Sequence, residues 1–161
     1  MGIRRELLTA FPPLAGVVED NMLSLRAALA GDCLCLAEPL LGYRRHDANL
    51  GDWVFDRSQA GYEGFQRRHR RVLSMYRDIA SDQEKCVAAR PDLPAERRAL
   101  ALELAAMYRL EADMREAILD EPRRKWLPLL ARGLVHPGLR RKSIERSLKL
   151  FVPRRSRFGR S

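Results

Sequence analysis

The chain has 161 residues, of which 46% are hydrophobic and 32% are charged, and its formal charge is +9. This length supports one domain with a proper core, and the hydrophobic fraction excludes an intrinsically disordered chain. No apolar run approaches the roughly 20 residues that a membrane-spanning helix needs, so any membrane contact is expected to be peripheral.

Two amphipathic segments open the chain. Residues 3–11 carry apolar side chains at helical spacing, and the pair Pro12 and Pro13 stops that pattern. Residues 19–30 repeat the spacing, with acids in the first turn, where a helix dipole favours them, and with Gly31 just past the end. The sequence therefore predicts a short helix over 3–11 and a well-delimited helix over 19–30.

Residues 33–43 have a different character. Two brief apolar runs are separated by a Glu-Pro step that a helix interior would not tolerate, which favours extended structure. Cys33 and Cys35 alternate, so a strand would place both thiols on one face. The chain has only three widely spaced histidines and no second cysteine pair, so we interpret the thiols as small buried apolar groups rather than zinc ligands.

Long helical periodicities follow over residues 52–90 and 94–120, joined by the segment RPDLP. One apolar stripe consists of Phe65, Val72, Met75, Tyr76 and Ile79, and the other of Leu100, Leu104, Met107, Met114 and Ile118. Two antiparallel helices that share a seam would bury both stripes. His69 lies on the first stripe and is interpreted as a seam residue, and His136 is assigned to a turn.

The last 40 residues, 122–161, hold 13 of the 30 Lys and Arg and a single acid, Glu145. Such a segment favours anionic surfaces. One apolar face consists of Trp126, Leu127, Leu130 and Leu134, and a second of Ile144, Leu148 and Phe151. Two interpretations are equally open: an amphipathic segment at a membrane interface, or ordinary helices that pack their apolar stripe on the domain. No motif for specific nucleic-acid recognition accompanies the charge.

The cellular setting is inferred from the cysteines. Their number is odd, and nothing near Met1 is typical of a signal peptide. A cytoplasmic protein, or one peripheral to the inner face of the membrane, is therefore expected.

Three segments in order carry a resemblance: MGIRRELLTAFPPL, VVEDNMLSLRAALAG and LAEPLLGYRRHDANLG. Together they resemble the carboxyl-terminal half of the catalytic domain in family 2 glycosyltransferases of the GT-A type. The resemblance covers residues 1–51, about a third of the chain, and rests on the order and spacing of its pieces rather than on any one of them. It implies an inverting transfer of sugar from a nucleotide-sugar donor to a glycan or lipid-linked acceptor.

The resemblance also implies roles for individual residues. Asp20 matches the family's catalytic base, and Glu19 would help position the site. Arg44, Arg45 and His46 would face the nucleotide diphosphate, and His46 would complete the shell of a divalent metal, Mg or Mn. The alternative is that the acids merely favour the start of the helix, and that the basic loop is solvated.

The chain departs from the family pattern in one respect. No Asp-x-Asp motif and no nucleotide-binding βαβ half occur in the sequence. We therefore expect a mainly α protein with two or three short strands, in which a partial GT-A domain over 1–51 is followed by a helical hairpin over 52–121 and a basic amphipathic tail over 122–161. Such a fragment would lack activity by itself. It would be marginally stable, self-associate or depend on a partner that supplies the missing half, because removing a parent sheet uncovers apolar surface.

A second class of function remains open. The chain would then be a non-enzymatic helical interaction module, with a basic tail that docks on a membrane or an acidic partner.

Overall fold

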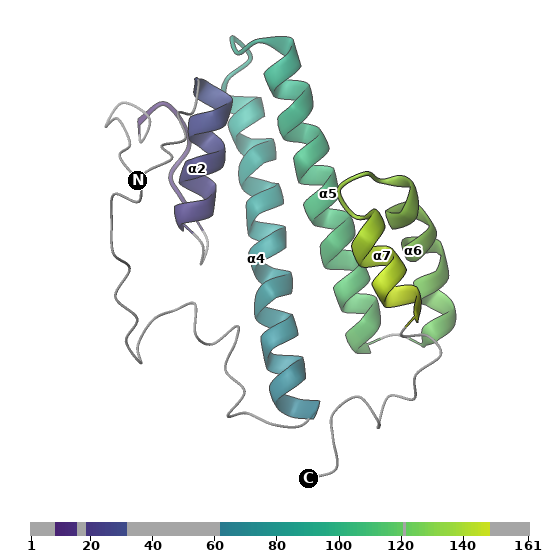
Figure 1. The fold of residues 1–161 in the computed structure, drawn as a ribbon. Coiled ribbons are helices and arrows are strands. Elements are labelled where there is room, and N and C mark those ends of the chain that lie inside the picture. The colour runs from purple at the N-terminus through teal and green to yellow at the C-terminus, as the bar shows by residue number, and fades with distance from the viewer. Residues whose placement is uncertain (1–8, 16–18, 32–61, 121, 149–161) are drawn as a thin grey trace, which may run out of the picture.

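A computed structural model describes residues 9–15, 19–31, 62–120 and 122–148. Its elements are α2 (Glu19–Ala30), α4 (Tyr62–Ala89), α5 (Ala95–Asp120), the 3-10 turn η1 (Arg123–Lys125), α6 (Trp126–Val135) and α7 (Arg140–Leu148). The long helices α4 and α5 form an antiparallel hairpin, α2 lies along one side of it, and α6 and α7 lie along the other (Figure 1). Within these ranges no helix is long and apolar enough to cross a membrane.

The expectation of a partial α/β GT-A domain with short strands is wrong for this part of the chain, which contains helices and no strand. The physical reason is visible in α2, which packs on the helical hairpin and not on a sheet. Its Leu29 belongs to a buried cluster with Cys86 of α4 and Ala101 of α5. The hairpin thus provides the apolar surface that a sheet would otherwise provide. The strands expected over 33–43 lie outside the described residues.

Small side chains line the seam between α4 and α5. Ala101, Ala105 and Ala112 are buried and recur at helical spacing with Tyr108, whose ring centroid is 5.3 Å from that of Tyr76 on α4. Alanines at these positions let the two backbones approach closely. The large residues predicted for the α5 stripe do not all lie there, because Leu100 is exposed. The side chains of Phe65 and Ile118 are outside the described part.

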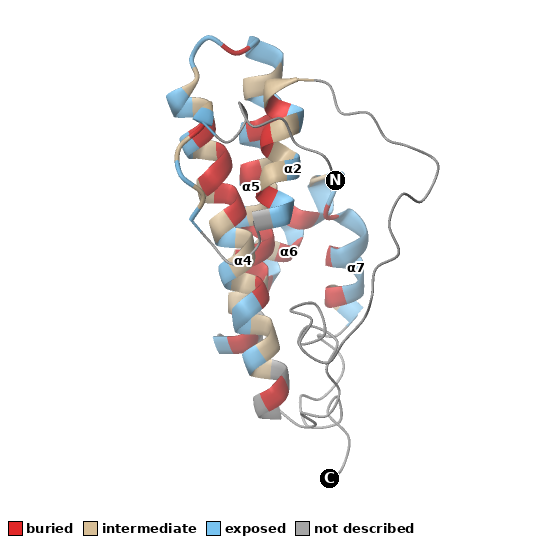
Figure 2. Ribbon diagram, turned by 90° about the vertical axis from the view of Figure 1, so that its left-hand side faces the viewer, coloured by how far each residue is buried: buried red, intermediate tan, exposed pale blue. Residues whose placement is uncertain are grey.

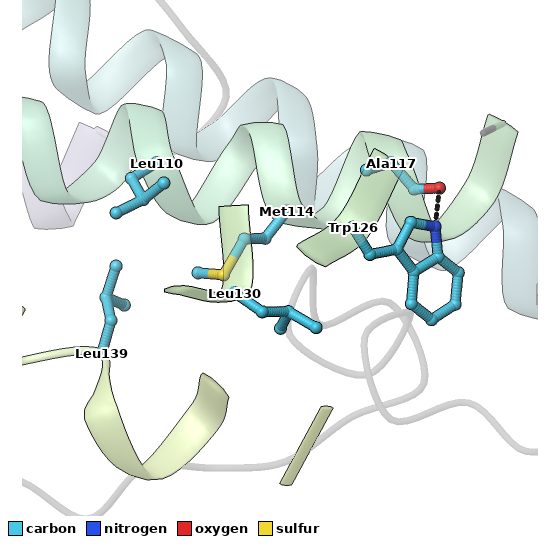
Figure 3. Close-up of a cluster of buried hydrophobic side chains, with 6 residues drawn as sticks. All are labelled: Leu110, Met114, Ala117, Trp126, Leu130 and Leu139. Carbon is cyan, nitrogen blue, oxygen red and sulfur yellow. Dashed lines mark hydrogen bonds between the residues drawn. The ribbon is translucent and has the colours of Figure 1, made fainter. Parts of the chain in front are cut away.

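The second core cluster joins α5 to α6 and to the turn that precedes α7. It consists of Leu110, Met114, Ala117, Trp126, Leu130 and Leu139 (Figure 3). Trp126 is buried, and its indole N–H donates a hydrogen bond of 2.7 Å to the carbonyl of Ala117. Of the two interpretations left open for this face, Trp126 therefore follows the one in which the helix packs on the domain, since it is buried between α5 and α6.

Gly133 brings α6 and α7 together. A Cβ atom at this position would lie 2.1 Å from Oγ of Ser143 and 3.2 Å from the sulfur of Met114. Any larger residue would push the two helices apart or away from α5.

Candidate functional site

The proposed base, Asp20, lies in the first turn of α2 and is exposed. Its backbone carbonyl accepts a hydrogen bond of 2.8 Å from the Ser24 hydroxyl. No hydrogen bond or ion pair with another described residue occupies its carboxylate. Asp20 is therefore accessible to a ligand, whereas the side chain of Glu19 is not among those described.

The helix that carries Asp20 is fixed to the hairpin by a buried ion pair. Arg26 lies on the buried face of α2, and its guanidinium makes two hydrogen bonds to the carboxylate of Asp82 on α4, one of them at 3.0 Å from Nε to Oδ2. Its remaining terminal nitrogen donates to the carbonyl of Pro12 at 2.7 Å. The bond to Asp82 raises the pKa of Arg26 although burial opposes this. Such a two-point pair fixes orientation as well as distance.

Phe11, in the segment that precedes α2, packs beside the ion pair of Arg26 and Asp82. The guanidinium carbon of Arg26 lies 5.8 Å from its ring centroid, and that of Arg90 lies 5.7 Å away. The buried phenyl ring therefore packs near two cations. The contacts of Phe11 and Pro12 connect the segment before α2 to both α2 and the end of α4.

Cys86 is the one thiol in the described ranges, and it is buried beside Asp82. Burial, with a further contribution from the negative charge of Asp82, raises the pKa of Cys86 to about 11. A buried thiol that is protonated at neutral pH is a poor nucleophile. Cys33 and Cys35 lie outside the described residues.

The remaining candidates, Arg44, Arg45 and His46, also lie outside the described residues, so the structure does not relate them to Asp20. Within the described residues there is no group of three or more His, Cys, Asp or Glu side chains that could hold a metal ion. His136 was predicted to lie in a turn, and it does. Its Nδ1 accepts a hydrogen bond of 3.2 Å from the backbone N–H of Gly138. His69 is half-buried on α4.

A second charged cluster lies on the opposite side of the hairpin. The buried carboxylate of Glu111 on α5 accepts two hydrogen bonds of 2.7 Å from Arg146 of α7. Arg115 donates to it at 3.2 Å, and the Lys142 ammonium lies 3.6 Å away. Burial by itself would raise the pKa of Glu111, but the bonds and charge of Arg146, with attraction from the other two cations, lower it overall.

The orientation of α7 follows from this cluster. The helix buries its polar residues Ser143 and Arg146 against α5, and exposes Ile144 and Leu148 (Figure 2). The interpretation that α7 packs its apolar stripe on the domain is therefore wrong. The ion pair with Glu111 places the polar face inside, and the apolar face is left outside. Phe151, expected on the same stripe, lies outside the described residues.

Comparison with protein-family models, with curated proteins and with solved structures finds no match for this chain.

Sequence reasoning missed both ion pairs. Arg26 shares a helical face with Met22 and Leu29, and Glu111 follows the buried Leu110, so each is a charged residue at or beside an apolar position. A charge at such a position needs a buried partner. That signal was present in the sequence, but it does not identify the partner, since Asp82 is 56 residues from Arg26.

Proposed function

We propose that the chain is the acceptor-side part of an inverting glycosyltransferase, in which Asp20 is the catalytic base. Asp20 would take the proton of the acceptor hydroxyl while that oxygen attacks the anomeric carbon of the donor sugar. The bond from the anomeric carbon to the nucleoside diphosphate breaks, and the diphosphate leaves with the bonding electron pair. Glu19, next to the base, would orient the acceptor.

The observation that carries this proposal is an exposed carboxylate on a helix held in a fixed position. A general base must reach its substrate and must be held within a fraction of an ångström of the productive geometry. Asp20 is exposed, and the same helix is tied to α4 through Arg26 and Asp82. Arg26 belongs to the segment LRAALAG on which the resemblance to the family depends. The role of this arginine in the proposal is to hold α2 on α4 through its ion pair with Asp82.

The proposal requires a donor-binding part that residues 1–161 do not contain. Arg44, Arg45 and His46 are proposed to contact the nucleotide diphosphate, and His46 a divalent metal. The described residues include no ligand set for this metal. The donor-binding part could precede Met1 on the same polypeptide or belong to another chain.

The test has two stages. First, the coding sequence on the amino-terminal side of Met1 and its neighbouring genes are searched for a strand-rich segment that ends in Asp-x-Asp. Second, the polypeptides are produced together, and nucleoside diphosphate release from a panel of nucleotide-sugars is followed by chromatography. Asp20→Asn should lower the rate by about a hundredfold or more, the range expected for loss of a general base.

Asp92→Asn is the matched control, because Asp92 is an exposed carboxylate in the turn between α4 and α5. It should leave the rate unchanged. Activity that survives Asp20→Asn would remove this residue from the base position. Absence of any donor-binding segment would leave the second candidate, a helical interaction module, which is favoured by the outward apolar face of α7.

A further inference from the structure

We infer that the outward face of α7 is a docking site for an anionic lipid surface. The face consists of Arg140, Arg141, Ile144 and Leu148, and we call it the α7 outer face. This inference is independent of whether Asp20 acts as a base, because it rests on the opposite side of the hairpin (Figure 1).

The first step is the exposure of two large apolar side chains. Ile144 is 49% exposed and Leu148 is 64% exposed. They are four residues apart and so lie on one side of the helix. Val135, the last residue of α6, is 79% exposed and precedes the short turn into α7. Exposed apolar residues that are neighbours on one side of a helix, as Ile144 and Leu148 are, indicate an interaction surface more than isolated ones do.

The second step is that the position of α7 is enforced from the inside. Arg146 and Ser143 are buried on the other side of the helix, and Arg146 is bound to Glu111 by two hydrogen bonds. Turning Ile144 and Leu148 inward would break this pair and leave the Glu111 carboxylate in the core with weaker partners. The outward orientation is therefore built into the packing of α7 on α5.

The third step is charge. Residues 122–148 contain eight Lys and Arg and one acid, Glu145. At 100° per residue, Arg140 and Arg141 flank the stripe formed by Ile144 and Leu148. Arg141 also forms an exposed ion pair of 3.2 Å with Glu145, which competes with an anionic surface only weakly. This is the arrangement of an interfacial helix, in which apolar side chains enter the acyl boundary and long cationic side chains reach the headgroups. Each cation near an anionic surface strengthens binding about fivefold.

Charge complementarity selects this occupant over the others. A second copy of the chain would bring the arginines of two α7 outer faces together, which like-charge repulsion opposes. Nucleic acid would use the arginines but would leave Ile144 and Leu148 without a role.

The experiment is cosedimentation of the full chain with vesicles. Vesicles of phosphatidylcholine mixed with phosphatidylserine should bind the protein, and vesicles of phosphatidylcholine alone should bind it much less. Added salt should weaken binding. The double variant Ile144→Gln with Leu148→Gln should bind about tenfold more weakly or worse, because two apolar side chains no longer enter the acyl region.

The chain offers a matched control in Leu100 and Leu102 of α5, which are 65% and 45% exposed. Leu100→Gln with Leu102→Gln removes the same kind of side chain at similar exposure, in the half of the hairpin away from α7 (Figure 1). It should bind like the wild type. A second comparison tests the contribution of the cations. The double variant Arg140→Gln with Arg141→Gln should weaken binding about twentyfivefold, whereas Lys85→Gln on the exposed side of α4 should change binding little.

Three outcomes would overturn the inference. The first is equal binding of the wild type to neutral and anionic vesicles, or none to either. The second is wild-type binding by the Ile144→Gln, Leu148→Gln variant, which would leave only charge and would favour nucleic acid or an acidic protein as the partner. The third is a wild-type dimer in gel filtration that this variant converts to a monomer, which would identify a second copy as the occupant. Helix content by circular dichroism verifies that each variant folds.

Discussion

On each side of the hairpin a short helix is bound through a buried ion pair, but the charge balance differs between the two sides. On one side α2 is bound through Arg26 to Asp82, and on the other α7 is bound through Arg146 to Glu111. In both cases the short helix provides the arginine and the hairpin provides the carboxylate. The pair at α2 is one cation against one anion, sealed by Phe11. The group at α7 places three cations around one carboxylate.

This difference indicates how each side should respond to its surroundings. A sealed, balanced pair is screened little by salt, and removal of either partner leaves a buried charge. A group with excess cations at the edge of the molecule is attractive to anions and depends on its one carboxylate. The α2 side therefore suits a fixed functional group, and the α7 side suits contact with a charged partner.

The largest loss of stability is expected from Asp82→Asn. This change leaves Arg26 buried without a counter-ion, and should lower the free energy of unfolding by about 3–5 kcal/mol, measured by urea denaturation. The thiol of Cys86 offers a second readout, since opening of the α2 side would expose it. Alkylation of Cys86 in the folded wild type should be slow, because its pKa is raised to about 11.

Asp120→Asn provides the control for Asp82→Asn. Asp120 is 39% exposed and pairs with Arg70 on the hairpin surface, so its loss should cost about 0–1 kcal/mol. Equal effects of the two substitutions would show that the Arg26 pair does not fasten α2.

A smaller effect, with a distinct pH dependence, is expected from Glu111→Gln. The substitution should cost about 2–3 kcal/mol at neutral pH, because Arg146 keeps only a neutral partner. The folded-state pKa of Glu111 is lowered from its ordinary value of 4.5. Its contribution to stability is therefore complete above pH 4.5 and is lost as the pH falls through the lower folded-state pKa.

The measurement is the difference in unfolding free energy between wild type and Glu111→Gln across that acid range. The difference should shrink as the pH falls, since protonated Glu111 resembles glutamine. A difference that stays constant would mean that folding does not shift the pKa of Glu111.

The smallest effect is expected from Gly133→Ala. The added Cβ would lie 2.1 Å from Ser143 Oγ and 3.3 Å from Ser143 Cβ, so Ser143 must change rotamer and α6 and α7 must move slightly apart, at a cost of about 1–2 kcal/mol. Gly31→Ala is the matched control, because nothing lies within 4 Å of a Cβ there. Thermal unfolding followed by circular dichroism compares the two, and a stable Gly133→Ala protein would indicate that the contact between α6 and α7 is loose.

Much of the helical layout could be predicted from the sequence. The acids at Glu19 and Asp20 and the glycine at Gly31 gave the bounds of α2, and two prolines marked the turn between α4 and α5. The seam was predicted less well. One face of α5 carries alanines toward α4, and another carries Leu110 and Met114 toward α6. The predicted stripe was selected for large apolar residues, so it mixed residues of the two faces.

The candidate site was predictable only in part. The position of Asp20 at the exposed start of a helix follows from local pattern. The ion pairs do not, because Arg146 and Glu111 are 35 residues apart and helical spacing carries no information on which elements meet. The orientation of α7 depends on that pair, so periodicity alone did not decide whether its apolar stripe faces the domain or the outside.

The alanines of α5 also limit how the hairpin can slip. Sliding α5 along α4 by about one turn would move Tyr108 toward a gap sized for the methyl group of Ala105 or Ala112. The hairpin therefore has a single register. This register sets the positions along the hairpin at which α2 and α7 attach. Inserting four residues into α5 between the turn and Glu111 would shift the attachment point of α7 against that of α2 by about 6 Å.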